Sequence, residues 1–202
     1  ILSINSEKIR KKLDDGNIVV ACGFQGVNSA GEITTLGRGG SDTSAVALAA
    51  ALRPSQCLIH TDVDGVYTTD PRLESRASKF SEASFEEMLE LAGMGAGVMH
   101  SRSIEIGKRF GIPIYVRSSF DEKPGSWIYT DNPTPRRAVA GAALLRNECR
   151  VTVFKVPDRP GAARTIFSKI ARKNVAVDMI VQNVADDGTT DISFTVQKGD
   201  FP

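Results

Sequence analysis

The residue types best suited to chemistry gather in one glycine-rich stretch, Gly37-Arg38-Gly39-Gly40-Ser41-Asp42-Thr43, directly ahead of an apolar run of helix formers. Glycines let the backbone approach a ligand closely, and a helix that starts behind them directs unpaired N–H groups at the loop. Arg38 adds a planar fork that matches a carboxylate or a phosphate. The stretch is typical of an anion site, although an ordinary turn with a Ser, Asp or Thr helix cap has the same composition.

A second group of polar residues follows an apolar segment at 57–60, which reads as a buried strand. It consists of Thr61, Asp62 and Asp64, with Gly65 allowing a turn. Ligands of parallel α/β sheets bind at the carboxyl ends of strands, so these carboxylates are candidates for a metal-binding or phosphate-binding site. An acidic turn after a strand is the plainer alternative.

The elements that must position these residues alternate between strands and helices. The patterns predict strands at 18–22, 57–60 and 113–117, and helices at 6–13, 43–52, 85–92 and 101–110. Ser84 and Glu87 have the spacing of a capping box, and Gly111 ends the last helix. This alternation predicts an α/β domain whose mainly parallel sheet is covered on both faces.

The chain changes character after a proline-rich linker at 131–137. Beyond it, the patterns predict strands at 150–156, 177–184 and 190–197 and an amphipathic helix at 161–174. This β-α-β-β order makes up most of a ferredoxin-like α+β unit. The expected organisation is a first domain at 1–130, a connecting segment at 131–149 and a smaller domain at 150–202.

Composition excludes several classes of function. The 202 residues are 41% hydrophobic and 24% charged, with a formal net charge of +1, which gives no electrostatic case for a nucleic-acid or membrane partner. Cys22, Cys57 and Cys149 are isolated, and His60 and His100 lack metal-ligand spacing with them. We therefore expect a cytoplasmic protein without a structural metal.

Five strings together resemble aspartate kinases of the amino acid kinase family, in that family's order and spacing: Gly23–Gly26, Thr35–Thr43, Thr61–Arg72, Phe85–Met88 and Val116–Ser119. The region after residue 150 resembles the ACT regulatory domain. The resemblance implies an amino-acid-kinase-like three-layer sandwich followed by a partial ACT domain. It also makes the chain look truncated, because the family's N-terminal lysine and glycine strand and the last ACT helix and strand have no counterpart. Residues 138–144 would then be an orphan strand of a second ACT unit, and the fragment alone is expected to be inactive.

The reaction that the resemblance implies is transfer of the γ-phosphoryl group of ATP, with Mg²⁺, to the side-chain carboxylate of L-aspartate. Arg38 would clamp the substrate's α-carboxylate. The pocket would be shaped by Gly39, Gly40 and Ser41. Asp42 would pair with the ammonium group and act in catalysis, with a helix N-cap as its alternative role.

The nucleotide side of the implied site lies at the second polar group. Thr61 and Asp62 would contact the nucleotide, with the catalytic Asp62 near the Mg²⁺-bound phosphates. Tyr67 would pack on the nucleoside, and the cations Arg72 and Arg117 would reach the phosphates. Plain core packing for Tyr67 and a surface charge for Arg72 are the alternatives.

One departure from the family concerns the phosphate side. Some aspartate kinases place a phosphate-contacting lysine where this chain has Gly97. A glycine carries no charge, so the site is expected to use backbone N–H groups or Arg117 instead.

In the ACT-like region, the resemblance implies a site for an amino-acid effector, lysine or threonine. Asp158 would bind its ammonium group, and the N–H groups of Gly161 and Ala162 its carboxylate. Gln182 and Asn183 would contact the rest of the effector. Because such a unit pairs edge to edge with a copy of itself, a homodimer or higher oligomer is expected. Turn and strand-end polarity explains the same residues equally well.

Two further interpretations stay open. Acetylglutamate, glutamate and uridylate kinases share the fold, and the ACT-like tail favours aspartate kinase over them. The chain could instead be an amino-acid-sensing module with an inactive kinase remnant, against which the presence of Arg38, Asp42 and Asp62 argues.

Overall fold

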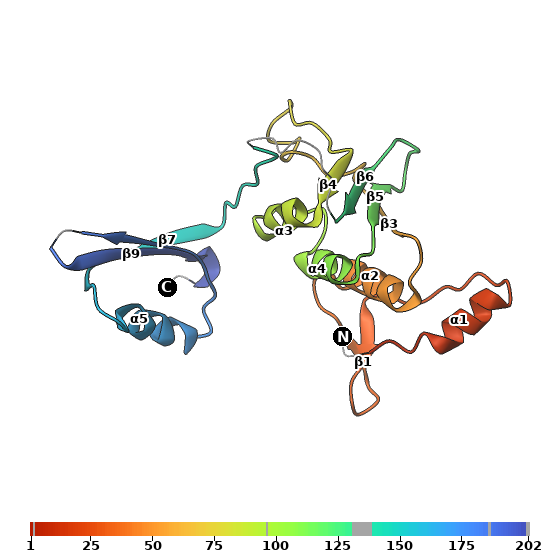
Figure 1. Ribbon diagram of the computed structural model, residues 1–202, viewed down its shortest axis with the longest axis horizontal. Coiled ribbons are helices and arrows are strands. Elements are labelled where there is room, and N and C mark those ends of the chain that lie inside the picture. The colour runs from red at the N-terminus through yellow and green to blue at the C-terminus, as the bar shows by residue number, and fades with distance from the viewer. Residues whose placement is uncertain (2, 96, 131–138, 186, 201–202) are drawn as a thin grey trace. The chain divides into compact units, whose positions relative to one another are not determined.

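The computed structural model describes residues 1, 3–95, 97–130, 139–185 and 187–200. They belong to two compact units, residues 1–144 and 145–202 (Figure 1). The division falls between Leu144 and Leu145, inside the predicted connecting segment. The predicted linker at 131–137 lies outside the described residues.

The first unit is built on a mixed four-stranded sheet in the order β3-β5-β6-β4. Its strands are β3 (Cys57–Thr61), β5 (Ile114–Ser118), β6 (Ser126–Tyr129) and β4 (Glu82–Ser84). β3 runs parallel to β5 and β4 runs parallel to β6, whereas β5 and β6 are antiparallel. Only a short loop joins β5 to β6, and a parallel pairing would require a long crossover. The predicted α/β class is confirmed.

Three helices supply the core that holds this sheet in place: α2 (Gly40–Leu52), α3 (Phe85–Gly93) and α4 (Ser101–Phe110). Alternate residues of β5 point into the core, where Ile114 and Val116 are fully buried. They pack against Val46 of α2, Phe85 of α3 and Ile104 of α4 in one apolar cluster. The ends of β3 and β5 are thereby fixed relative to the start of α2.

Two predicted helix signals in this unit are confirmed. Ser84 and Glu87 form both arms of the capping box at α3, and Gly111 ends α4 in the left-handed conformation with a φ of 63°. None of the helices in the described ranges is long and apolar enough to cross a membrane.

The strand expected at 18–22 is wrong. These residues have no regular secondary structure, and the side chains of Ile18 and Val20 are 95% and 93% exposed. A strand exists only where a neighbouring strand accepts its backbone hydrogen bonds, and no strand in the described part of the chain pairs with this one. Apolar alternation alone therefore misled the prediction.

The start of α2 also differs from the prediction. The helix begins at Gly40 rather than at residue 43, and its N-cap is Gly39, with a φ of 70°. The hydroxyl and N–H groups of Thr43 donate to the Gly39 carbonyl at 2.6 and 3.1 Å. That closes the first turn, so Asp42 lies inside the helix and is not its cap.

Outside the sheet, the first unit contains helix α1 (Glu7–Asp14) and a hairpin of β1 (Gln25–Val27) and β2 (Ile33–Thr35). The hairpin was not predicted. Its turn is closed by Asn28, whose side-chain oxygen accepts hydrogen bonds from the N–H groups of Ala30 and Glu32. The hairpin leads directly into the glycine loop.

The second unit confirms the predicted β-α-β-β order. It contains β7 (Glu148–Pro157), α5 (Ala162–Ala171), β8 (Val177–Val184) and β9 (Thr189–Gln197), followed by a short 3₁₀ turn at Lys198–Asp200. The strands form an antiparallel sheet in the order β7-β9-β8. Ile192, Phe194 and Val196 of β9 are buried, and Ile166 and Phe167 of α5 pack against them.

The orphan strand expected at 138–144 is not found: residue 138 lies outside the described residues, and 139–144 have no regular secondary structure. The N–H of Ala142 donates to the Thr68 carbonyl at 2.7 Å. A Cβ on Gly141 would lie 2.7 Å from the same oxygen. The segment is therefore held against the loop after β3 by close backbone contact, and Ala143 packs against the core, without strand pairing.

Candidate active site

The glycine loop at residues 36–39 reaches its shape through left-handed backbone. Gly37 and Gly39 have φ values of 75° and 70°, which residues with a Cβ rarely adopt. The N–H of Gly40 donates to the Gly37 carbonyl at 2.9 Å. This tight turn presents Arg38, which is exposed, directly ahead of the N-terminus of α2. The predicted grouping of Arg38 with Gly39, Gly40, Ser41 and Asp42 is thus present in the structure.

The start of α4 packs closely against this loop. A Cβ added at Gly39 would lie 2.3 Å from the Cβ of His100, so only glycine fits there. One guanidinium nitrogen of Arg102 donates to the carbonyl of Leu36 at 3.0 Å and also to that of Arg38. The contact of His100 with Gly39 and the hydrogen bonds of Arg102 join segments more than 60 residues apart. No local sequence pattern predicts them.

Asp42 lies half-buried in the first turn of α2. Burial raises the pKa of this carboxyl above its ordinary value, and the backbone N–H and the charge of His100 offset part of that effect. A carboxylate in the first turn is also favoured by the helix dipole. The Asp42 carboxylate is thus partly desolvated, and its charge would be stabilised by a cationic partner.

Three of the residues predicted for the nucleotide side lie at one edge of the sheet, where β3 and β5 end. Thr61 pairs with Ser118 and His60 with Arg117 in the parallel register, and the N–H of Ser119 donates to the Thr61 carbonyl at 2.8 Å. Asp62 follows at the edge and is exposed; its side chain accepts a hydrogen bond from the Thr61 hydroxyl at 3.1 Å. The structure therefore brings Thr61, Asp62 and Arg117 to the same edge.

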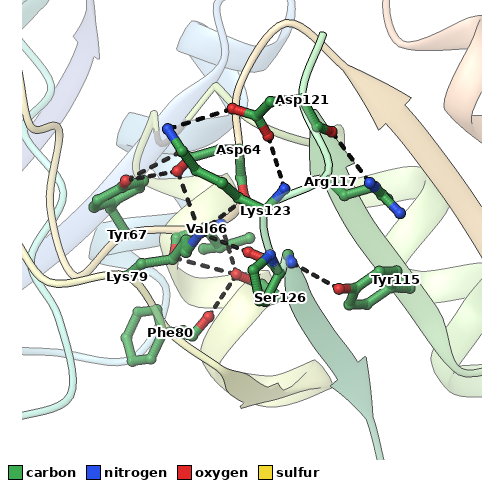
Figure 2. Close-up of polar contacts among 12 residues, drawn as sticks. Asp64, Val66, Tyr67, Lys79, Phe80, Tyr115, Arg117, Asp121, Lys123 and Ser126 are labelled. Carbon is green, nitrogen blue, oxygen red and sulfur yellow. Dashed lines mark hydrogen bonds and ion pairs between the residues drawn. The ribbon is translucent and has the colours of Figure 1, made fainter. Parts of the chain in front are cut away.

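A polar network joins the loops beyond this edge, as Figure 2 shows. The Lys79 ammonium donates to the Asp64 carboxylate at 3.2 Å and to the Pro124 carbonyl at 2.6 Å. The Tyr67 hydroxyl donates to Asp64 at 3.0 Å. Burial alone would raise the pKa of Asp64, but the hydrogen bonds from Lys79 and Tyr67, with the charge of Lys79, hold it below its ordinary value. Lys79 therefore ties the loop after β3 to the loop after β5.

Buried Ser126 anchors the same network from the start of β6. Its hydroxyl accepts from the N–H of Val66 at 2.9 Å and donates to the Phe80 carbonyl at 2.6 Å. A Cβ at Gly65 would lie 2.6 Å from this hydroxyl oxygen, so glycine is required for the loop to pack here. Ser126 and Lys79 were missed in the sequence, where neither belongs to a motif that was recognised.

The two candidate phosphate-side arginines differ in their surroundings. Arg117 is partly buried, donates to the Asp121 carbonyl at 3.1 Å, and has a buried Nε atom without a hydrogen-bond partner among the residues that the structure describes. Arg72 is exposed and forms an ion pair with Asp70 at 2.8 Å. The hydrogen bonds and charge of Asp70 raise the pKa of its guanidinium, and the charge of Asp62 adds a smaller contribution. Gly97 lies exposed in the loop before α4. Among the described residues, no group of three or more His, Cys, Asp or Glu side chains gathers as a metal site would.

The predicted effector residues lie at the start of α5 and along β8. Gly161 is the left-handed N-cap of α5 with a φ of 92°, and Asp158 is exposed just before it. The N–H of Ala162 already donates to the Arg159 carbonyl at 3.2 Å. Gln182 and Asn183 are exposed on β8, in register with Ile192 and Asp191 of β9.

Comparisons with known proteins agree along the whole chain. The sequence profile described as "Amino acid kinase family" matches residues 1–118, and that of the ACT domain matches residues 150–202. An aspartate kinase from Pseudomonas putida is 49% identical over all of this chain and 49% of its own length. The chain thus spans about half the length of the curated relatives it matches.

Two solved structures of E. coli aspartokinase III share the fold, each 34% identical and matched over 94% of this chain and 42% of theirs. The complex with aspartate and ADP has a TM-score of 0.79, and the complex with lysine and aspartate has a TM-score of 0.75.

Proposed function

Because this chain belongs to the amino acid kinase family, we propose that it forms part of an aspartate kinase, which uses Mg²⁺-ATP to phosphorylate the side-chain carboxylate of L-aspartate. The observation that carries this proposal is the glycine loop, whose left-handed turn presents Arg38 beside the N-terminus of α2. Similarity to aspartate kinases over the whole chain supports it. A family reaction on a carboxylate needs a cation of this kind to hold the substrate.

On the substrate side, Arg38 binds the α-carboxylate of aspartate as a two-pronged clamp, with Gly39, Gly40 and Ser41 lining the pocket. Asp42 pairs with the α-ammonium group, which compensates for the cost of burying its carboxylate. The side-chain carboxylate is then free to point toward the nucleotide.

On the nucleotide side, the edge formed by β3 and β5 receives ATP. Thr61 and Asp62 contact the phosphate end, Tyr67 lies beside the nucleoside, and Arg72 and Arg117 face the phosphates. The Nε of Arg117 has no hydrogen-bond partner among the described residues, so its N–H is available to a phosphate oxygen. Arg117 would thereby supply the positive charge that Gly97 cannot. The exposed carboxylate of Asp62 fits a magnesium ion that keeps several waters and binds phosphate oxygens. Bound there, the ion would neutralise charge on the phosphates.

In the reaction, an oxygen of the aspartate side chain forms a bond to the γ-phosphorus while the bond from that phosphorus to the β–γ bridging oxygen breaks. The products are 4-phospho-L-aspartate and ADP. The residues of this chain act by positioning the two reactants in line and by opposing the developing charge.

The second unit serves regulation. An amino-acid effector, lysine or threonine, binds near Asp158 and the start of α5, with Gly161, Ala162, Gln182 and Asn183 around it. The exposed edge strands β7 and β8 pair with a second copy, giving a homodimer or a larger assembly. The protein works in the cytoplasm, in keeping with the three free cysteines Cys22, Cys57 and Cys149.

The test replaces the matched region of the Pseudomonas putida aspartate kinase by this chain. ADP release is then measured with Mg²⁺-ATP and aspartate, glutamate, N-acetylglutamate or UMP, with and without lysine and threonine. Turnover that depends on aspartate and falls with lysine or threonine supports both parts of the proposal. A chimera that binds lysine or threonine but does not turn over aspartate would leave an amino-acid-sensing module as the better description.

A further inference from the structure

Arg102 holds the glycine loop from outside it. It lies in the first turn of α4, and its Nη2 atom donates to the carbonyl oxygens of Leu36 and Arg38. The Leu36 carbonyl belongs to the peptide group before Gly37 and the Arg38 carbonyl to the one before Gly39, the two glycines with φ values of 75° and 70°. One nitrogen therefore fixes the peptide group ahead of each left-handed glycine.

The loop needs such a contact because its own sequence gives it little stiffness. Gly37, Gly39 and Gly40 lose more conformational entropy on ordering than any other residue type. The hydrogen bonds within the loop reach from Gly40 to Gly37 and from Thr43 to Gly39. Neither of these restrains the carbonyl of Arg38, which Arg102 does.

The position of Arg102 is itself well defined. Its own N–H is capped by Nδ1 of His100 at 3.3 Å, and the side chain of His100 lies against Gly39. α4 is held in the core by buried Ile104. The start of α4 is thus a rigid support from which Arg102 reaches the loop.

We propose that Arg102 is a positioning residue for the substrate site: it orders the glycine loop so that the Arg38 side chain is presented for binding. Arg102 acts through the loop backbone and does not itself touch the substrate. This inference rests on the proposed function for the role of Arg38, whereas the ordering of the loop by Arg102 stands independently of it.

The first arm of the test measures hydrogen exchange in this chain, without any ligand. Arg102→Ala is compared with Arg109→Ala, which removes an exposed arginine from the last turn of the same helix. We expect amide exchange across residues 36–43 to become about fivefold faster in Arg102→Ala, because the loop loses about one net hydrogen bond. Arg109→Ala should leave it unchanged. Equal exchange in the two variants would overturn the proposal.

The second arm measures kinetics in the Pseudomonas putida chimera. Arg102→Ala is expected to raise the KM for aspartate about tenfold, the size of one to two net hydrogen bonds, with the KM for ATP changed less than about twofold. Millimolar guanidinium should restore part of the aspartate affinity in Arg102→Ala, and Arg102→Lys should keep part of it, because one ammonium nitrogen can also donate to both carbonyls. A merely structural role would instead lower kcat or affect both substrates alike.

The two arms separate the two ideas. A wild-type chimera without aspartate turnover would sink the proposed function, and the exchange result would still decide whether Arg102 orders the loop. Faster exchange with an unchanged KM for aspartate would overturn the link between loop order and substrate binding.

Discussion

The glycine loop at 36–39 and the polar network around Asp64 both lie in the first unit, but one is built from backbone and the other from side chains. The loop depends on left-handed glycines and on carbonyls held by Arg102. The network depends on the side chains of Asp64, Lys79 and Ser126, each of which is buried or partly buried. The order of the loop therefore depends on one arginine from α4, whereas the network consists of buried groups that satisfy one another.

The two carboxylates at the centre of these regions show the same contrast. Burial raises the pKa of Asp42, so its charged form costs stability. Asp64 is also penalised by burial, yet Lys79 and Tyr67 lower its pKa overall. In the proposed site a cation would compensate the charge of Asp42, whereas the charge of Asp64 already has its partners. That difference is what a binding residue and a structural residue should show.

The largest expected effect comes from placing a side chain on the loop. Gly39→Ala puts a Cβ against His100 and forces a left-handed φ, so we expect a loss of about 3 kcal/mol or more in the free energy of unfolding. Urea unfolding followed by Trp127, the single tryptophan, reports on the first unit. Gly37→Ala is the matched control, because nothing lies within 4 Å of its Cβ, and should lose only about 1–2 kcal/mol. Equal losses in the two variants would contradict a steric clash between a side chain at position 39 and His100 at the start of α4.

Ser126→Ala should have the next largest effect, this time in the network. It leaves the N–H of Val66 and the carbonyl of Phe80 without their buried partner, at about 2 kcal/mol. The same urea titration measures the loss. The exposed Ser119→Ala serves as control and should stay within about 0.5 kcal/mol of the wild type. If Ser126→Ala proved equally mild, the network would not be rigid.

Lys79→Met should cost about 1–2 kcal/mol, because it breaks an ion pair whose two side chains are only 24% and 29% exposed. In the chimera we also expect the KM for ATP to rise and the KM for aspartate to stay, the reverse of Arg102→Ala. Arg72→Met removes an ion pair whose arginine is 87% exposed and should change stability by less than about 0.5 kcal/mol. A rise in the KM for aspartate with Lys79→Met would contradict the proposal that the network around Asp64 serves the nucleotide and the glycine loop serves aspartate.

The smallest effects come from neutralising each carboxylate, and they should have opposite signs. At pH 7, Asp42→Asn should raise the free energy of unfolding by about 0.5–1 kcal/mol while removing aspartate turnover, and Asp64→Asn should lower it by a similar amount. Urea midpoints at pH 7 measure both changes. Two changes of the same sign would show that the regions do not differ in the way proposed.

Acid titration sharpens the same comparison. The lowered pKa of Asp64 gives stability that is fully present above its ordinary value of 3.8 and is lost as the pH falls through the lower folded-state value. The raised pKa of Asp42 acts in the other sense: stability increases as the pH falls through the folded-state value toward 3.8. We therefore expect the urea midpoint of Asp64→Asn to rise as the pH is lowered through the folded-state pKa of Asp42. In Asp42→Asn this rise should be absent.

Short-range patterns in the sequence predicted much of this structure. The capping box of Ser84 and Glu87, the end of α4 at Gly111 and the glycine loop before α2 were all evident, because each is set by residues within a few positions of one another. Local patterns failed where a partner was needed. The apolar residues around Ile18 and Val20 alternate like a strand, but they do not pair with another strand among the described residues.

By itself, the sequence determined the α/β class of the first unit, the β-α-β-β order of the second, the glycines that make the loop possible and the candidate residues Arg38, Asp42 and Asp62. Only the tertiary structure decided which long-range contacts hold the loops: Arg102 on Arg38, Lys79 between Asp64 and Pro124, and Ser126 on Val66. These contacts join residues 15 to 64 positions apart. No local pattern specifies such pairs, since they form only after the core has brought their elements together.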